Sequence, residues 1–306
     1  MYDLIIIGSG PAGLAAAIYA QRAGLNALVL EKAVSGGQVL TTYEVDNYPA
    51  LPGISGFDLG MKMKEHADKL GAKFKTGSVS AIVPAKEGSA EESVHTVICD
   101  GEELQTKGII LATGAHHALL GIPGEAEFQG MGVSYCATCD GAFFRNRDVA
   151  VVGGGDVALE DAIFLARICR KVYLIHRRDE FRANKALQDG LKQYENIELV
   201  LSSTVETIKG ADMVEAVTVR NKITAEEKDL PVSGVFVAVG IVPDSEAFSN
   251  VLAANEKGYI LAGEDCRTNV ARIYVAGDVR AKQLRQIVTA VADGANAVTS
   301  FQEDLL

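Results

Sequence analysis

The chain opens with an unbroken apolar run instead of an alternating pattern. Residues 4–7 read Leu-Ile-Ile-Ile, which is typical of a strand buried on both faces of a parallel sheet. A glycine-rich turn at 8–13, a helical pattern over 11–23 and a second apolar strand over 27–30 follow. Together these segments predict a strand–helix–strand unit, the arrangement that joins neighbouring parallel strands.

The same order of elements returns in the middle of the chain. Residues 148–152 predict a strand, 153–155 a turn, 157–168 a helix and 171–175 a strand. Apolar strands that end in glycine are predicted over 108–114, 234–240 and 272–277, and a C-terminal helix over 284–303. The predicted fold class is α/β, with two Rossmann-like nucleotide-binding domains, each built on a central parallel sheet. The second domain, residues 115–243, is inserted in the first, residues 1–114 and 244–306.

Composition narrows the class of protein. The chain has 306 residues, 48% of them hydrophobic and 23% charged, which is typical of a soluble globular enzyme. A net charge of −11 argues against a nucleic-acid groove and against an anionic membrane surface. No apolar stretch reaches the roughly 18–20 residues of a membrane span. We therefore expect a cytoplasmic enzyme in which Cys99, Cys169 and Cys266 are buried structural thiols.

The first glycine loop, Gly8-Ser9-Gly10-Pro11-Ala12-Gly13, lies between the first strand and the first helix. Its glycines allow a tight turn, close approach of the backbone to a pyrophosphate, and close packing of helix on strand. The helix N-terminus then faces the phosphates with its partial positive charge. Glu31 ends the second strand, 21 residues after Gly10, where a carboxylate accepts hydrogen bonds from an adenosine ribose. The loop therefore predicts a dinucleotide site.

The second loop, Gly153-Gly154-Gly155-Asp156-Val157-Ala158, has alanine in place of the third glycine. The position 21 residues after Gly155 holds His176, and arginines follow it at 177, 178 and 182. A carboxylate there would repel a 2′-phosphate, whereas guanidinium groups bind it with paired hydrogen bonds. The cluster predicts NADPH in preference to NADH; a solvated basic segment is the alternative. If this site takes NADPH, the other is expected to take FAD.

A pair of cysteines precedes the second unit, in Cys136-Ala137-Thr138-Cys139-Asp140. Two cysteines separated by two residues can close a small disulfide ring reversibly. A structural zinc ion needs four ligands, and the sequence has no second such pair. A redox dithiol is therefore predicted over zinc ligands or inert core cysteines, and no metal site is predicted. Asp140 is either a proton carrier for thiol–disulfide exchange or a cap of the following turn.

Taken in this order, the motifs resemble those of the low-molecular-weight, bacterial-type thioredoxin reductases, a class within the pyridine nucleotide-disulfide oxidoreductases. The resemblance spans nearly the whole chain, and the combination is far more specific than any one match. Besides the two loops and the cysteine motif, the matches are Gly36-Gly37-Gln38, Asp46-Asn47-Tyr48-Pro49, Ala112-Thr113-Gly114, His176-Arg177-Arg178-Asp179, Phe181-Arg182, Ala276-Gly277-Asp278 and Arg285-Gln286.

The resemblance implies a homodimeric enzyme that reduces thioredoxin with NADPH, through FAD and a Cys136–Cys139 disulfide. Cys139 would lie nearest the flavin, Cys136 would attack the partner's disulfide, and Asp140 would be the acid–base group. The implied FAD contacts are Gly8, Ser9, Gly10, Pro11, Ala12, Glu31, Gly37, Gln38, Asn47, Thr113, Gly114, Gly277, Asp278, Arg285, Gln286 and Ile287. The implied NADPH contacts are Gly154, Gly155, Asp156, Val157, Ala158, His176, Arg177, Arg178 and Arg182.

Other acceptors stay open. A reductase of this architecture could serve another thioredoxin-like protein, a peroxiredoxin-system protein or ferredoxin, or pass electrons to oxygen; a nucleotide-sensing module without catalysis is the non-enzymatic alternative. The dithiol argues against the ferredoxin type and the sensing module, and the arginine cluster against the oxidase. The sequence departs from the family pattern at Val157, where relatives often carry a small hydroxyl residue, and at Ala50-Leu51. Neither departure changes the class.

Overall fold

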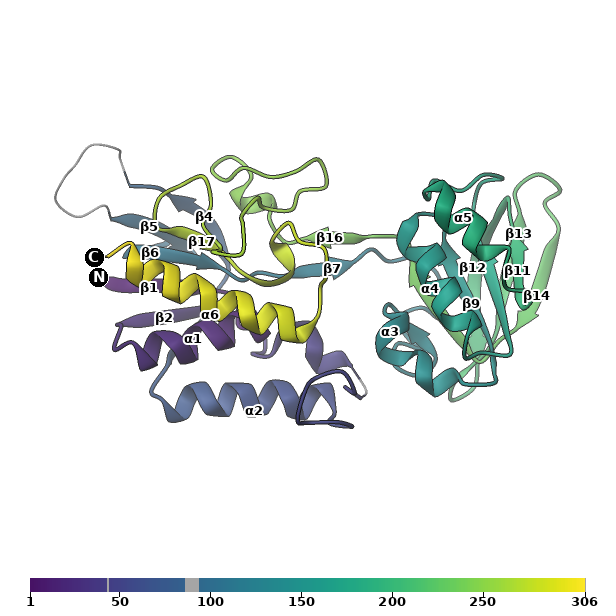
Figure 1. Ribbon diagram of the computed structural model, residues 1–306, viewed down its shortest axis with the longest axis horizontal. Coiled ribbons are helices and arrows are strands. Elements are labelled where there is room, and N and C mark those ends of the chain that lie inside the picture. Colours follow the sequence, from purple (N-terminus) through teal and green to yellow (C-terminus); the bar gives the residue numbers. More distant parts are fainter. Residues whose placement is uncertain (43, 86–93, 306) are drawn as a thin grey trace. The chain divides into compact units, whose positions relative to one another are not determined.

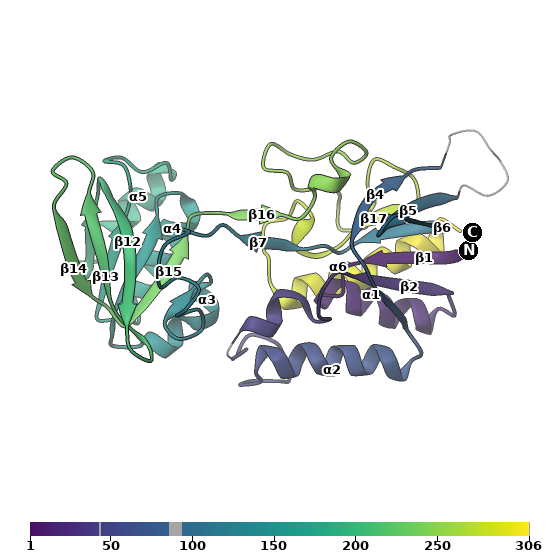
Figure 2. The ribbon, with the colours of Figure 1, turned by 180° about the vertical axis from the view of Figure 1, so that it is seen from behind.

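The computed structural model describes residues 1–42, 44–85 and 94–305. The chain divides into two compact units, which we call unit 1 (Met1–His116 and Val242–Leu306) and unit 2 (His117–Ile241). Each unit has a sheet with parallel strands and helices packed on it (Figures 1 and 2). The predicted α/β fold class is therefore confirmed.

The sheet of unit 1 has a parallel part and an antiparallel part, in the order β3-β2-β1-β6-β5-β4, with β17 also paired to β6. The parallel strands are β1 (Tyr2–Ile7), β2 (Ala27–Glu31), β3 (Lys73–Thr76), β6 (Glu102–Leu111) and β17 (Ile273–Val275); the antiparallel strands are β4 (Val79–Val83) and β5 (His95–Cys99). The run of residues 4–7 is buried because β1 is central and covered on both faces. The carboxyl ends of β1, β2, β6 and β17 meet at one edge of the sheet, where ligands bind in such folds.

Helices α1 and α6 lie side by side on one face of this sheet (Figures 1 and 2). The longer helices of unit 1 are α1 (Pro11–Arg22), α2 (Gly56–Lys69) and α6 (Ile287–Glu303), and its short 3-10 helices are η1 (Gly37–Thr41), η3 (Glu246–Phe248) and η4 (Gly277–Val279). One core cluster joins Leu14 of α1 and Phe301 of α6 to the sheet, and a second fills the other face around Phe248 and Leu252.

The C-terminal helix begins later than its apolar pattern predicts. The predicted start at Leu284 is wrong, because α6 begins at Ile287. Gln286 and Thr289 cap the helix reciprocally, each side chain bonding the other residue's backbone N–H. Arg285 and Gln286 are therefore held ahead of the helix N-terminus, where Arg285 donates to the carbonyl oxygen of Asp278 at 3.3 Å.

A test of this packing is the Gly294→Ala substitution in α6. A methyl group there would lie 2.1 Å from the carbonyl oxygen of Ala12 in α1, so the two helices must separate. We expect a loss of about 1–3 kcal/mol in unfolding free energy, measured by urea unfolding followed by circular dichroism. Ala292→Ser, on the exposed face of the same helix, is the matched control. An equal effect of the two substitutions would mean that the close approach is not required.

Unit 2 has a five-stranded parallel sheet and a three-stranded antiparallel sheet, with a hydrophobic core between them. The parallel sheet runs β11 (Ile197–Val200), β10 (Lys171–Ile175), β9 (Asp148–Gly153), β15 (Gly234–Ala238) and β8 (Val133–Ser134), and the antiparallel sheet β12 (Ser203–Gly210), β13 (Val214–Asn221) and β14 (Glu227–Pro231). Where the chain passes between the units, β7 (Ala115–His117) pairs with β16 (Ile241–Pro243).

The helices of unit 2 cover the other face of the parallel sheet, around a second core cluster. They are α3 (Ala137–Asp140), α4 (Asp156–Ala166), α5 (Lys185–Leu191) and the 3-10 helix η2 (Gly141–Phe144). Helix α4, which the sequence predicts over 157–168, starts one residue earlier and ends two residues earlier than predicted. Over the described ranges of the chain, we find no helix with both the length and the apolar character of a membrane span.

Candidate active site

The first glycine loop leaves the end of β1 and enters α1 in unit 1. Gly8 has φ +100°, which favours glycine, and its N–H donates to the carbonyl of Leu30 at 2.8 Å. A side chain on Gly13 would lie 1.9 Å from the Gly8 carbonyl, so helix and turn require glycine at both positions. Glu31 accepts from the N–H and the hydroxyl of Ser9 at 2.7 and 2.8 Å. The predicted carboxylate is therefore anchored beside the loop.

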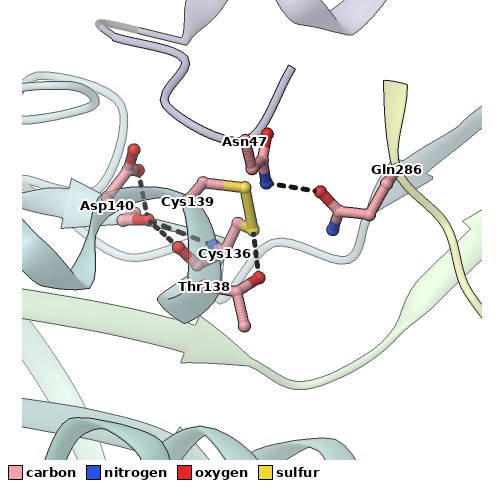
Figure 3. Close-up of a disulfide and its surroundings, with 7 residues drawn as sticks. Asn47, Cys136, Thr138, Cys139, Asp140 and Gln286 are labelled. Carbon is pink, nitrogen blue, oxygen red and sulfur yellow. Dashed lines mark hydrogen bonds between the residues drawn. A yellow bond between two sulfur atoms is a disulfide. The ribbon is translucent and has the colours of Figure 1, made fainter. Parts of the chain in front are cut away.

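Several residues that the resemblance assigns to FAD come together around this loop. A Cβ on Gly37 would lie 2.8 Å from the Cα of Gly10, so the two glycine backbones touch. The amide of Asn47 donates to the side-chain oxygen of Gln286 at 2.9 Å, across 239 positions of sequence (Figure 3). Of the remaining residues of this set, Pro11 and Ala12 start α1, Gln38 lies in η1, Thr113 and Gly114 follow β6, Gly277 starts η4, and Ile287 starts α6.

Asp278 is a partly exposed acceptor at this edge of the sheet. Burial raises the pKa of its carboxyl, against the opposing charges of Lys282 and Arg285. Its Oδ1 is buried and has no hydrogen-bond partner among the described residues; the ammonium of Lys282 lies 3.6 Å away. A buried carboxylate oxygen is normally paired with a donor. A hydroxyl of a ribityl chain would supply one, so these residues fit a flavin dinucleotide.

The turn that carries Asp278 is fastened by Asp293, which the sequence reasoning missed. Asp293 lies in α6 and accepts from the N–H of Gly277 at 2.9 Å. The same carboxylate accepts from Arg280 at 2.8 and 3.1 Å and from Lys282 at 3.1 Å. With 4% of its surface exposed, Asp293 is a buried charge compensated by two cations. Its position in an otherwise apolar helical pattern is the signal that could have revealed it.

The second glycine loop joins β9 to α4 in unit 2, and His176 lies directly against it. A Cβ on Gly154 would meet the imidazole at 2.1 Å, so only glycine leaves room for the ring. His176 is 5% exposed and stacks on Phe181 with ring centroids 5.5 Å apart. Burial lowers the pKa of His176, so it is predominantly neutral near pH 7. The histidine therefore shapes the site, and positive charge must come from the arginines.

Arg177, Arg178 and Arg182 are exposed beside this loop. None of the three forms an ion pair with any residue that the structure describes. The backbone N–H of Arg182 donates to the carbonyl of Gly154 at 2.9 Å, which ties the arginine segment to the glycine turn. Three guanidinium groups are thus available to an anion next to a helix N-terminus.

The start of α4 holds the rest of the second loop in place. Gly155 is the N-cap residue, Ala158 is buried, and Val157 is 53% exposed. The carboxylate of Asp156 accepts from the N–H and the side-chain amide of Asn184 at 2.8 and 3.1 Å. Asp156 therefore links the helix start to the segment that follows the arginines, a contact that sequence spacing did not indicate.

Cys136 and Cys139 form a disulfide in unit 2, with an S–S distance of 2.14 Å and a Cα–Cα distance of 5.3 Å. Cys136 is the N-cap residue of α3, and its sulfur lies 3.4 Å from the hydroxyl of Thr138 (Figure 3). Both cysteines are partly exposed. The pair is thus a disulfide within reach of solvent, as a dithiol that exchanges with another protein requires.

Asp140 ends α3, directly after Cys139. Burial raises the pKa of its carboxyl, and a hydrogen bond from Ser134 opposes the shift. Its Oδ2 accepts from the Ser134 hydroxyl at 2.6 Å, while its Oδ1 is buried without a hydrogen-bond partner in the described chain. The side chain makes no capping bond to η2, so the alternative interpretation of Asp140 as a cap is wrong. A carboxyl with a raised pKa beside a disulfide can carry a proton to sulfur.

The other cysteines are separate from this chemistry. Cys99, Cys169 and Cys266 are buried free thiols, as predicted for structural residues. Burial raises the pKa of Cys169 to about 11 and of Cys266 to about 12, so both stay protonated near neutral pH. Within the described ranges, His, Cys, Asp and Glu side chains do not gather in any group of three or more that could hold a metal ion.

Two glycine loops of the dinucleotide-binding kind and a disulfide beside a partly buried acid define a class of enzyme, the disulfide oxidoreductases that use a pyridine nucleotide. The family model described as pyridine nucleotide-disulphide oxidoreductase matches residues 2–294. The chain therefore belongs to this family of oxidoreductases. Membership of the family implies a flavin and a nicotinamide cofactor.

Relatives named thioredoxin reductase match nearly the whole chain, and the predicted resemblance is confirmed. A thioredoxin reductase of Listeria monocytogenes is 45% identical over 304 residues, 99% of this chain and 93% of that relative. A thioredoxin reductase of Bacillus subtilis is 42% identical over 303 residues, 99% of this chain and 94% of the relative. The crystal structure of thioredoxin reductase from Streptococcus pyogenes matches with a TM-score of 0.93 and 41% identity, covering 100% of this chain and 98% of that one.

Proposed function

We propose that this enzyme reduces the disulfide of thioredoxin, with NADPH as electron donor and FAD as the internal carrier. The observation that carries the proposal is the Cys136–Cys139 disulfide, partly exposed and followed directly by the partly buried acid Asp140. Relatives named thioredoxin reductase, matched over nearly their whole length, support the choice of acceptor. The homodimer is carried over from the same resemblance, and the cytoplasmic location from the composition of the chain.

FAD is assigned to unit 1, which carries the first glycine loop, Glu31 and Asp278. The N-terminus of α1 would face the pyrophosphate, Glu31 would bind the ribose, and Asp278 would accept from the ribityl chain. Asn47, Arg285 and Gln286 would lie along the ring. Bound there, FAD supplies a ring that takes up a hydride from reduced nicotinamide and passes two electrons to a disulfide.

NADPH is assigned to unit 2. Gly154, Gly155 and the N-terminus of α4 would hold its pyrophosphate. Arg177, Arg178 and Arg182 would bind the 2′-phosphate, and the neutral His176 would line the turn beneath it. Since the arginines carry all the positive charge of this cluster, they set the preference for NADPH over NADH.

The dithiol completes the transfer. Reduction of the Cys136–Cys139 disulfide takes up two electrons and two protons and yields two thiols. The Cys136 thiolate attacks the partner's disulfide, forms a mixed disulfide and expels the partner's other sulfur as a thiolate, which is then protonated. Cys139 then attacks the Cys136 sulfur, which restores the internal disulfide and releases the partner as a dithiol. Asp140 exchanges the protons with these sulfurs.

The proposal is tested by anaerobic titration of the purified protein. NADPH is expected to bleach the flavin absorbance, and oxidised thioredoxin to restore it. If another disulfide protein restores the absorbance and thioredoxin does not, the acceptor is that protein. A flavin that NADPH does not bleach would contradict a reductase and favour a nucleotide-sensing module.

A further inference from the structure

Ser134 is a buried polar residue beside the dithiol that neither the motifs nor the mechanism above employs. It is the last residue of β8 and is 5% exposed. Its hydroxyl lies 2.6 Å from the Oδ2 of Asp140, 3.1 Å from the backbone nitrogen of Cys136 and 3.4 Å from the Cys136 carbonyl oxygen. The side chain thus contacts both the acid and the backbone of the first cysteine.

The Ser134 hydroxyl has a single proton, and the Asp140 carboxylate is its most favourable acceptor. The bond to Asp140 is much shorter than the contact with the Cys136 carbonyl, and hydrogen bonds to carboxylates are the stronger kind. The oxygen of Ser134 meanwhile accepts from the N–H of Cys136. The hydroxyl is therefore oriented from both sides, as donor to Asp140 and acceptor from Cys136.

The two oxygens of the Asp140 carboxyl consequently differ. Oδ2 is fixed by Ser134, whereas Oδ1 is buried and has no hydrogen-bond partner in the described parts of the chain. The residue after Asp140, Gly141, is packed against apolar side chains of helix α4. A Cβ on Gly141 would lie 3.0 Å from Leu165 and from Phe164. Only Oδ1 is left to hold a proton and pass it on.

We propose that Ser134 is a positioning residue for the reaction of the dithiol, which fixes Asp140 by Oδ2, leaves Oδ1 as the oxygen that carries the proton and holds the backbone of Cys136 in place. The inference rests on the proposed acid–base role of Asp140. The hydroxyl also stabilises the ionised carboxyl: burial raises the pKa of Asp140, the Ser134 bond lowers it, and no charged neighbour contributes to the shift. Without the hydroxyl, no interaction opposes the rise in the Asp140 pKa that burial causes.

The Ser134→Ala substitution tests this in the oxidised holoenzyme. The carboxyl of Asp140 is followed by infrared difference spectroscopy as pH is varied, with its band assigned by its loss in Asp140→Asn. We expect the pKa of Asp140 to rise by about 1–2 pH units, as loss of a hydrogen bond to a charged group predicts. One limb of the pH–rate profile for thioredoxin reduction should disappear in Asp140→Asn. In Ser134→Ala, the midpoint of that limb is expected to move to higher pH by the same amount.

Ser134→Thr is the matched control, because it keeps the hydroxyl and is expected to retain the wild-type pKa. Ser134→Gly removes the hydroxyl by a second route and is expected to reproduce the alanine shift if the alanine variant does not fold. An unchanged band pKa and an unchanged pH profile in the variants without the hydroxyl would overturn the proposal. If instead Asp140→Asn keeps the wild-type rate and profile, the acid–base role of Asp140 fails, whereas the infrared shift still reports on the Ser134 contact.

Discussion

Replacing Cys136 with serine is expected to lower turnover with thioredoxin by about 10³-fold or more, as loss of a catalytic nucleophile typically does. NADPH should still bleach the flavin of this variant. A serine hydroxyl is not ionised near neutral pH without an activating base, and it cannot form a disulfide. The electrons therefore reach the flavin but have no route to the partner. Stopped-flow absorbance measures the first step and a coupled thioredoxin assay the second.

The division of roles between the two sulfurs is tested by the companion variant Cys139→Ser. It retains the Cys136 thiol, which is expected to form a mixed disulfide with thioredoxin that persists because no second cysteine resolves it. Gel electrophoresis without reductant would detect the covalent complex. Cys169→Ala, which alters a buried free thiol of the same unit, serves as control and should reduce thioredoxin normally. A complex trapped by Cys136→Ser and not by Cys139→Ser would reverse the two roles.

Much of the fold follows from local patterns. The runs at residues 4–7 and 148–152 are apolar because β1 and β9 are central strands, and each is followed by glycines that only a tight strand-to-helix turn requires. The start of α6 was misplaced for an equally local reason. Leu284, Arg285 and Gln286 continue the helical pattern, but the reciprocal cap of Gln286 and Thr289 starts the helix after them. A capping box with glutamine as the N-cap residue falls outside the usual serine or threonine pattern.

The parts of the site that sequence reasoning missed depend on long-range contacts. Ser134 bonds Asp140 across only six positions, but the two-residue strand that carries it, β8, pairs with β15, about a hundred positions later in the chain. Asn47 meets Gln286 across 239 positions, and Asp293 fastens a turn that belongs to another element. No spacing rule predicts such contacts. For His176, the spacing predicts a contact with the 2′-phosphate, which stays a prediction; the structure adds that the ring is buried against Gly154, which spacing did not indicate.

The double substitution Arg177→Ala and Arg178→Ala is expected to raise the Michaelis constant for NADPH roughly 10²- to 10⁴-fold, the effect of losing two hydrogen-bonded charges on a phosphate. The constant for NADH should barely change, because NADH has no 2′-phosphate. Both arginines are exposed and pair with no carboxylate that the structure describes, so their removal should cost little stability. Steady-state kinetics with each nucleotide measures the ratio.

The control for that experiment is Arg170→Ala, which removes a guanidinium of the same unit. Arg170 forms paired hydrogen bonds with Asp148 at 2.7 and 2.8 Å, at the start of β9, while the arginine cluster follows the end of β10. Its loss should leave both Michaelis constants unchanged. A parallel loss of affinity for NADPH and NADH in the double variant would instead place the arginines on a part common to both nucleotides. Since burial keeps His176 neutral, it cannot replace the missing charges. The preference for NADPH over NADH should therefore be largely lost, because the remaining pyrophosphate contacts are the same for both nucleotides.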